Sequence, residues 1–238
     1  MATWIAHLRL SDNMLNYGFD LQPQAFFVGS IAPDASLLQG DEWQPSKSVT
    51  HFRDENGRLQ PEDFYDVYLR DKTYDANTYS FLIGYYTHLL ADVEWIGNVW
   101  RPLKHDHPDI AQRMETDPDF AYEFKRYNYF GHDFLYLDAN PNYPAWQMVK
   151  DFNTVTTSLD FLPDNLLMTW LNSDVKATYE DLTFLETIKT YDFPYLSQWD
   201  MQTWLDCTTG VLIEMLKGKR VPCPNYRPLW GAYIQPYA

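Results

Sequence analysis

The sequence is poor in cysteine, glycine and basic residues, and each shortage excludes a class of protein. Its two cysteines, Cys207 and Cys223, are too few for a disulfide framework, so a reducing compartment is expected. Ten glycines among 238 residues, with no internal repeat, exclude a collagen-like or low-complexity chain. Because 18 Lys and Arg face 33 Asp and Glu, the net charge of −15 repels phosphate backbones, and no nucleic-acid partner is expected.

Long apolar runs are also missing. No stretch approaches the ~20 apolar residues that a membrane span requires, so we expect no transmembrane segment. The first residues, MATWIAHLRLSDNML, are amphipathic and lack the basic leader, the continuous apolar run and the small-residue cleavage site of a signal peptide. Together with the low cysteine count, this pattern predicts a cytoplasmic protein.

Aromatic residues, in contrast, are abundant, and apolar residues recur at helical spacing. Hydrophobic residues make up 45% of the chain and aromatic residues 17%, which is enough to form an ordered core. The spacing predicts a single all-α domain over residues 1–238, a multi-helix bundle without a β-hairpin. Helices are expected in the N-terminal segment, at 23–32, from Pro61 onward, and at 76–97, 119–137, 143–160, 164–189 and 195–217.

Three segments are expected to be non-helical. Residues 35–60 carry turn signals and are predicted as a loop, and the proline-rich residues 101–118 as a connector. The C-terminal segment VPCPNYRPLWGAYIQPYA is predicted to be an extended aromatic tail that covers the helical body. Its candidate packing residues are Trp230, Tyr233 and Tyr237.

The most informative motif is His88-Leu89-Leu90-Ala91-Asp92. It lies in the segment 76–97, which is apolar nearly all round and is therefore predicted to be the central helix. Residues four apart share one helix face with Cβ atoms ~5–6 Å apart, so this imidazole and carboxylate can reach one divalent cation. The alternative is a structural His–Asp pair, since an unpaired buried charge is costly.

Three further residues stand where a buried polar side chain is unusual. His7 lies on the apolar side of the first helix, Asp34 directly follows an apolar segment, and His51 lies between Thr50 and Phe52. Each of them alone is most simply a core or cap residue. Together with the His88 motif, in a chain of six histidines, they favour a metal site. Imidazole and carboxylate ligands suit zinc, and also iron or manganese.

The order of these residues resembles that of the zinc-dependent phospholipase C fold, an all-α family that also includes single-strand-specific fungal nucleases. The phrases WIAHL, GSIAPD, VTHF and GYYTHLLAD are similar to those of bacterial cytoplasmic zinc-dependent phospholipase C-like hydrolases, and the ordered motifs cover residues 1–95. The residues that match the order of the family's ligands are Trp4, His7, Asp34, His51, His88 and Asp92.

The resemblance implies a metal-dependent hydrolase of phosphate monoesters or diesters, with two ions or even one, and with zinc as the favoured ion. One ion would be held by Asp34, His51, His88 and Asp92, and a second by His7 and Asp92, with Asp92 bridging. A metal-bound hydroxide would attack phosphorus, and Asp34 would act as general base or as a metal-orienting carboxylate. The implied substrate is a small phosphate ester or a phospholipid headgroup.

Two departures from the family pattern lead to a further prediction. In the secreted enzymes the tryptophan is the mature N-terminus and binds metal through its amine and carbonyl, but Trp4 is internal here. The chain also has Tyr136 four residues after His132, where the family has a carboxylate, so a third zinc is not expected. We expect His132 or Asp133 to complete the second ion's ligands, with Asp133 binding directly or orienting an imidazole.

Two other hypotheses remain open. The chain could be a non-catalytic helical protein that keeps its His and Asp residues as a structural metal site or a buried polar network. The adjacent pair His132-Asp133 also allows an HD-type metal phosphohydrolase, with His51 and either Asp160 or Asp164 as the remaining ligands. This second hypothesis leaves the His88 motif unexplained, so it ranks lower.

Overall fold

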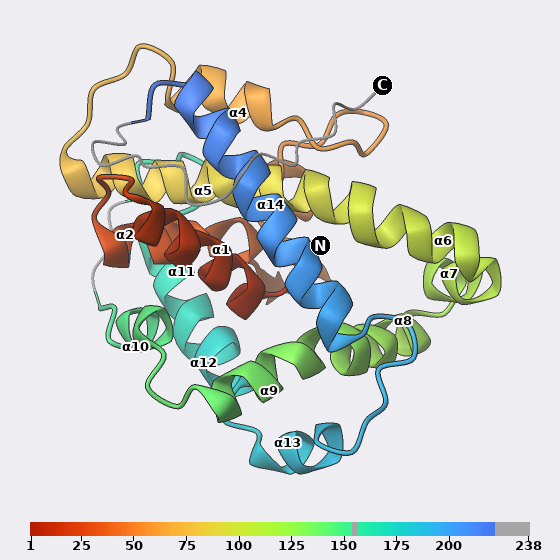
Figure 1. Ribbon diagram of the computed structural model, residues 1–238. Helices are drawn as coiled ribbons and strands as arrows, with labels where there is room; N and C mark the ends of the chain where they lie inside the picture. The colour runs from red at the N-terminus through yellow and green to blue at the C-terminus, as the bar shows by residue number, and fades with distance from the viewer. Residues whose placement is uncertain (154–156, 222–238) are drawn as a thin grey trace.

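The computed structural model describes residues 1–153 and 157–221, and over these residues the all-α prediction is confirmed (Figure 1). Cys223 and the expected aromatic tail, with Trp230, Tyr233 and Tyr237, lie outside the described residues. The α-helices are α1 (Trp4–Tyr17), α2 (Pro23–Gly29), α3 (Lys47–Thr50), α4 (Pro61–Tyr68), α5 (Ala76–Trp95), α6 (Arg101–Asp106), α7 (Pro108–Thr116), α8 (Pro118–Lys125), α9 (Gly131–Ala139), α10 (Pro144–Lys150), α11 (Asp164–Trp170), α12 (Lys176–Thr178), α13 (Leu182–Ile188) and α14 (Gln198–Gly218). Shorter 3₁₀ and π segments are η1 (Ala32–Asp34), η2 (Ile96–Trp100), η3 (Arg126–Phe130) and η4 (Leu171–Val175).

Several segment predictions were wrong in detail. The expected loop at 35–60 contains an antiparallel hairpin of β1 (Leu37–Gln39) and β2 (Glu42–Gln44), because Gly40 adopts the left-handed φ of 65° that a tight turn requires. The expected connector is helical and forms α6 and α7, since its prolines occupy the first turn of a helix, where no N–H bond is lost. The expected helices at 143–160 and 164–189 are shorter or interrupted.

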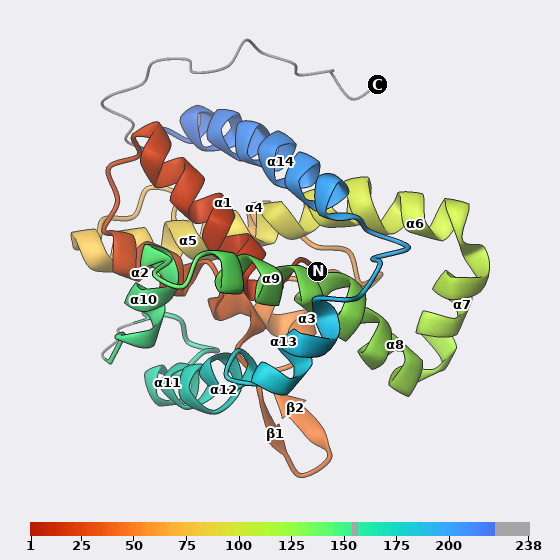
Figure 2. The same ribbon diagram turned by 60° about the horizontal axis from the view of Figure 1, so that its bottom comes forward.

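Helix α5 crosses the middle of the molecule, as the sequence predicts for the helix with the His88 motif (Figures 1 and 2). Asp75 caps its first turn by accepting backbone N–H groups of Asn77 and Thr78, which satisfies two otherwise free donors. Nearly every residue of α5 from Thr78 onward is buried, and α1, α2, α4 and α14 all pack against it. The helix therefore holds its polar residues away from solvent.

A close backbone crossing of α2 and α5 fixes the position of the motif. A Cβ atom at Gly29 would lie 2.1 Å from the Phe81 carbonyl oxygen, and one at Gly84 would lie 2.3 Å from the Phe26 carbonyl oxygen. Only glycine permits both approaches. Gly84 is one helical turn before His88, so this crossing brings the end of α2, with Ser30, onto the turn of α5 that carries the imidazole.

Candidate metal centre

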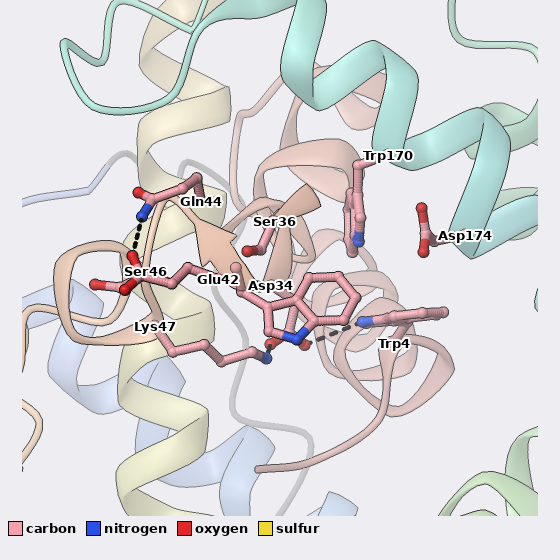
Figure 3. A pocket seen from close by; sticks show the side chains of 10 residues that line it. Trp4, Asp34, Ser36, Glu42, Gln44, Ser46, Lys47, Trp170 and Asp174 are labelled. Atoms are coloured by element: carbon pink, nitrogen blue, oxygen red, sulfur yellow. Dashed lines mark hydrogen bonds and ion pairs between the residues drawn. The ribbon is translucent and has the colours of Figure 1, made fainter. Parts of the chain in front are cut away.

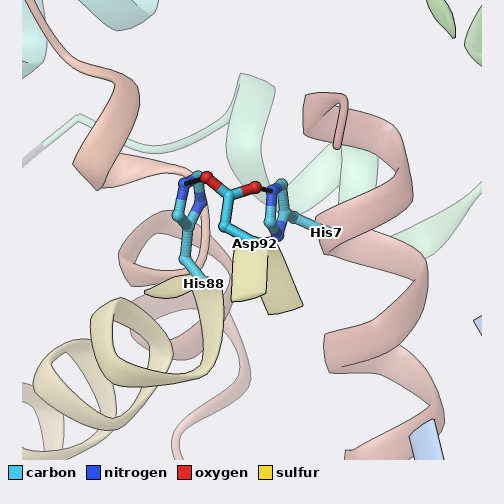
Figure 4. Close-up of side chains that lie close together, drawn as sticks. All are labelled: His7, His88 and Asp92. Atoms are coloured by element: carbon cyan, nitrogen blue, oxygen red, sulfur yellow. Dashed lines mark ion pairs between the residues drawn. The ribbon is translucent and has the colours of Figure 1, made fainter. Parts of the chain in front are cut away.

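Five of the predicted site residues come together in the interior. His7 comes from α1, Asp34 from η1, His51 directly follows α3, and His88 and Asp92 lie on α5. All five are buried, and Asp34 is the most exposed of them at 7%. Figure 4 shows His7 facing the carboxylate of Asp92 from one side and His88 from the other. Segments that lie far apart in the chain therefore contribute to one cluster.

Asp92 is at the centre of this cluster. Its Oδ1 lies 3.6 Å from His7 Nε2, and its Oδ2 lies 3.6 Å from His51 Nε2 and 3.7 Å from His88 Nε2. Asp34 Oδ1 lies 3.5 Å from His51 Nε2. Two sets of potential ligand atoms each lie within 4.8 Å of one another: His7, His88 and Asp92, and Asp34, His51 and His88.

These distances suit ligands of a common ion better than hydrogen bonds. An N–H···O hydrogen bond joins heavy atoms at ~2.7–3.2 Å. Two ligands bound at ~2.0–2.2 Å with a tetrahedral angle lie ~3.3–3.6 Å apart. Within the part of the chain that the structure describes, four atoms of the cluster are buried without a hydrogen-bond partner, which is costly unless something else binds them. These atoms are His7 Nε2, His51 Nε2, His88 Nε2 and Asp92 Oδ2.

The tautomer of His88 is fixed for ligation. Its Nδ1 lies 2.8 Å from the carbonyl oxygen of Ser30, which can only accept, so Nδ1 donates and Nε2 keeps its lone pair. Burial, together with the stacked His7 ring 3.8 Å away, lowers the pKa of His88 to about 3. The imidazole is therefore neutral at physiological pH, which is the form that binds a metal.

The two carboxylates are ionised despite their burial. Burial opposes ionisation of Asp34, but the Lys47 ammonium holds its pKa well below the usual range. Trp4 Nε1 donates to Asp34 Oδ2 at 3.0 Å, and Lys47 pairs with Oδ1. Burial likewise opposes ionisation of Asp92, but the nearby α-amino group and the imidazoles lower its pKa, and the Ala2 N–H donates to its Oδ1 at 3.1 Å.

The structure does not bring His132 and Asp133 into either set of potential ligands. His132 Nε2 lies 2.8 Å from the Leu196 carbonyl oxygen, so it donates there instead of facing the cluster. Asp133 accepts hydrogen bonds from the Thr3 hydroxyl, the Ile5 N–H and the Tyr179 hydroxyl. Gly131, the residue before His132, leaves no room for an ion to approach, because side chains of α13 and the following loop fill the space beside it.

The ligand pattern of an HD-type phosphohydrolase is not assembled either. Asp164 accepts from the N–H and hydroxyl groups of Thr157, which makes it a local cap, and Asp160 is exposed. His51 instead lies beside Asp34 and Asp92. The alternative of a buried polar network is weakened by the unsatisfied imidazole nitrogens in the cluster.

A pocket of about 730 Å³ opens beside the cluster, with Asp34 in its wall (Figure 3). Asp34 is thus shared between the buried imidazoles and the pocket. Sequence reasoning missed most of the wall, including Lys47 and Trp170, because no local pattern marks residues that only the tertiary fold brings together. The lining residues are Trp4, Asp34, Ser36, Glu42, Trp43, Gln44, Ser46, Lys47, Trp170 and Asp174.

Over the described residues, no helix combines the length and the apolar character needed to cross a membrane. Comparison with curated proteins and with solved structures gave no match. Comparison with protein families gave one, to zinc dependent phospholipase C over residues 3–187, which include all five residues of the cluster. Because this match covers most of the chain and agrees with the ordered motifs, the chain belongs to the zinc-dependent phospholipase C family.

Proposed function

We propose that this protein is a zinc-dependent, phospholipase C-like phosphodiesterase with its active site at the cluster around Asp92. The observation that carries the proposal is the set of buried imidazole nitrogens without hydrogen bonds, spaced as ligands of a common ion would be. The family match supports zinc as the ion and hydrolysis as the reaction.

The candidate ligands form two overlapping groups that share His88, and we assign them to two ions. Asp34, His51 and His88 would hold one ion together with Asp92 Oδ2, and His7 would hold the second with Asp92 Oδ1. Because its two oxygens face different histidines, Asp92 has the orientation of a bridging carboxylate. Bound zinc supplies Lewis acidity towards a phosphoryl oxygen and lowers the pKa of water.

The contacts of Asp34 and His88 indicate what each side chain would do at the site. Asp34 has its carboxylate oriented by the Trp4 indole N–H and by Lys47, and its low pKa makes it a weak base. We therefore assign Asp34 an orienting and ligating role in preference to that of general base. The Ser30 carbonyl fixes the tautomer of His88, and the crossing of α2 and α5 excludes water from the turn behind it.

The pocket supports a substrate larger than inorganic phosphate. Three tryptophans line it, Trp4, Trp43 and Trp170, and they offer apolar walls for the organic part of an ester. The substrate that fits is a small phosphodiester or a phospholipid headgroup. The low cysteine count supports a cytoplasmic location for this activity.

The test combines metal analysis with turnover. Protein purified without chelator should carry tightly bound zinc, and it should hydrolyse bis(p-nitrophenyl) phosphate; exhaustive chelation should abolish turnover and re-addition of zinc should restore it. Zinc binding without turnover of any phosphodiester would favour the non-catalytic hypothesis. Absence of bound metal, with stability unchanged in chelator, would favour a buried polar network.

A further inference from the structure

Lys47 stands between the buried cluster and the open pocket. It is the first residue of α3, and its ammonium pairs with Asp34 Oδ1, the oxygen that also faces His51 (Figure 3). The Lys47 side chain is 44% exposed, whereas that of Asp34 is 5% exposed. The ammonium therefore lies at the mouth of the site, where a molecule in the pocket can reach it.

The ion pair between Lys47 and Asp34 would separate if a cation bound Asp34. Only the lysine end of the pair is open to water, since the Asp34 side chain is 5% exposed, so a competing charge is needed to displace the ammonium. A divalent cation at Asp34 Oδ1 would compete for the same lone pairs and repel the ammonium. The flexible four-carbon stem then allows the ammonium to turn into the pocket.

The wall of the pocket is acidic apart from Lys47, whatever ions the cluster holds. Asp34 forms part of this wall. The pocket wall adds the carboxylates of Glu42 and Asp174, and the whole chain has a net charge of −15. An anionic phosphodiester would meet repulsion in these surroundings. Among the described residues that line the pocket, Lys47 is the only basic one.

We propose that Lys47 is a catalytic residue that binds a non-bridging phosphoryl oxygen of the substrate. This inference rests on the proposed function and adds a group that the ligand motifs do not contain. The ammonium donates charge-assisted hydrogen bonds to the phosphoryl oxygen and offsets the negative charge that develops there during hydrolysis. Its pairing with Asp34 keeps it at the site when no substrate is present.

The test compares Lys47→Met and Lys47→Arg with a matched control, Lys72→Met, which removes the same charge at an exposed position. Three quantities are measured on zinc-loaded protein: zinc per chain, the dissociation constant of inorganic phosphate by calorimetry, and kcat/KM for bis(p-nitrophenyl) phosphate. In Lys47→Met we expect phosphate affinity and kcat/KM to fall roughly 10–100-fold with zinc content unchanged. Lys47→Arg should recover part of both losses, and the control should match wild type.

Two results would overturn the proposal. One is a Lys47→Met protein whose phosphate affinity and turnover stay within twofold of wild type. The other is loss of zinc in that variant, which would mean that Lys47 acts through Asp34 and not on the substrate. A wild-type protein that binds zinc and phosphate but hydrolyses no ester would refute the proposed function and with it the catalytic role of Lys47, while the phosphate measurement would still test whether Lys47 binds the phosphoryl oxygen.

Discussion

Replacing Asp92 by Asn tests the bridging carboxylate directly. The amide has the shape of the carboxylate and can still accept from the Ala2 N–H, so the change removes charge with little change in volume. Because Oδ1 accepts from Ala2, the new NH₂ group takes the place of Oδ2, 3.6 Å from His51 Nε2 and 3.7 Å from His88 Nε2, whose lone pair faces it. We expect Asp92→Asn to fold but to lose most of its stabilisation by zinc.

The magnitude follows from linkage between binding and folding. Free zinc at 1,000 times its dissociation constant stabilises a one-site protein by about 4 kcal/mol, and a 100-fold weaker site gains only about 1.4 kcal/mol at that concentration. The difference of about 2.7 kcal/mol corresponds to roughly 5–10 °C in melting temperature for a chain of this size. The loss is larger if Asp92 serves two ions, since both sites then weaken.

The assay is a thermal melt at increasing free zinc, with Glu94→Gln as the control. Glu94 lies two residues further along α5 and its side chain accepts from Asn98, so the control removes one charge from the same helix outside the cluster. Equal zinc-induced shifts in Asp92→Asn and wild type would refute the ligand assignment. A variant that is less stable in chelator, with no zinc effect on either protein, would identify a polar network instead.

Three further predictions concern the scaffold and the histidines. Gly84→Ala puts a Cβ 2.3 Å from a backbone carbonyl oxygen of α2, so the free energy of unfolding, measured in urea, should fall by about 1–3 kcal/mol or more. The control is Gly97→Ala, whose added Cβ meets nothing within 4 Å, and it should not destabilise the protein. His88→Ala removes the imidazole common to both ligand sets, so zinc per chain measured by mass spectrometry should fall, while His105→Ala, at an exposed residue, should keep wild-type zinc. Burial lowers the pKa of His132 from 6.5 to about 4. Between pH 6.5 and 4 the unfolded state therefore binds more protons than the folded state. The contribution of the neutral His132 to stability is thus complete above pH 6.5 and is lost as the pH falls toward 4. His132→Gln should show a shallower decline of unfolding free energy across that window in urea titrations at fixed pH; a decline as steep as that of wild type would contradict the argument.

The cluster could be predicted from sequence because its signals are local. His88 and Asp92 share a helix face by their spacing alone, and His7 stands out as a polar residue on an apolar face. The other two members of the cluster, Asp34 and His51, could be predicted because their order in the chain resembles that of the family's ligands. In contrast, no motif marks Lys47, the first residue of α3, and it reaches Asp34 only because α3 packs against η1.

The errors in the fold have a common physical cause. The proline content of residues 101–118 predicts a connector, yet Pro102, Pro108 and Pro118 stand in first turns of helices, where the missing N–H has no partner to lose. The same composition therefore fits a connector or a series of short helices. The hairpin was missed because each of its strands is only three residues long and shows no clear alternation of apolar and polar residues.

Asp133, expected either to bind an ion or to orient an imidazole, contacts the first turn of the helix that carries His7. Thr3 is the N-cap of α1 but makes no side-chain bond to its own helix, and Asp133 accepts its hydroxyl and the N–H of Ile5 instead. Burial raises the pKa of Asp133 to about 6, and these donors together with Tyr179 oppose that rise. On the other side, Asp92 accepts from Ala2. The first turn of α1 is therefore held between two carboxylates from different helices, which directs His7 Nε2 toward Asp92. Asp133 thus supports the position of His7, whereas His132 donates to the Leu196 carbonyl oxygen elsewhere.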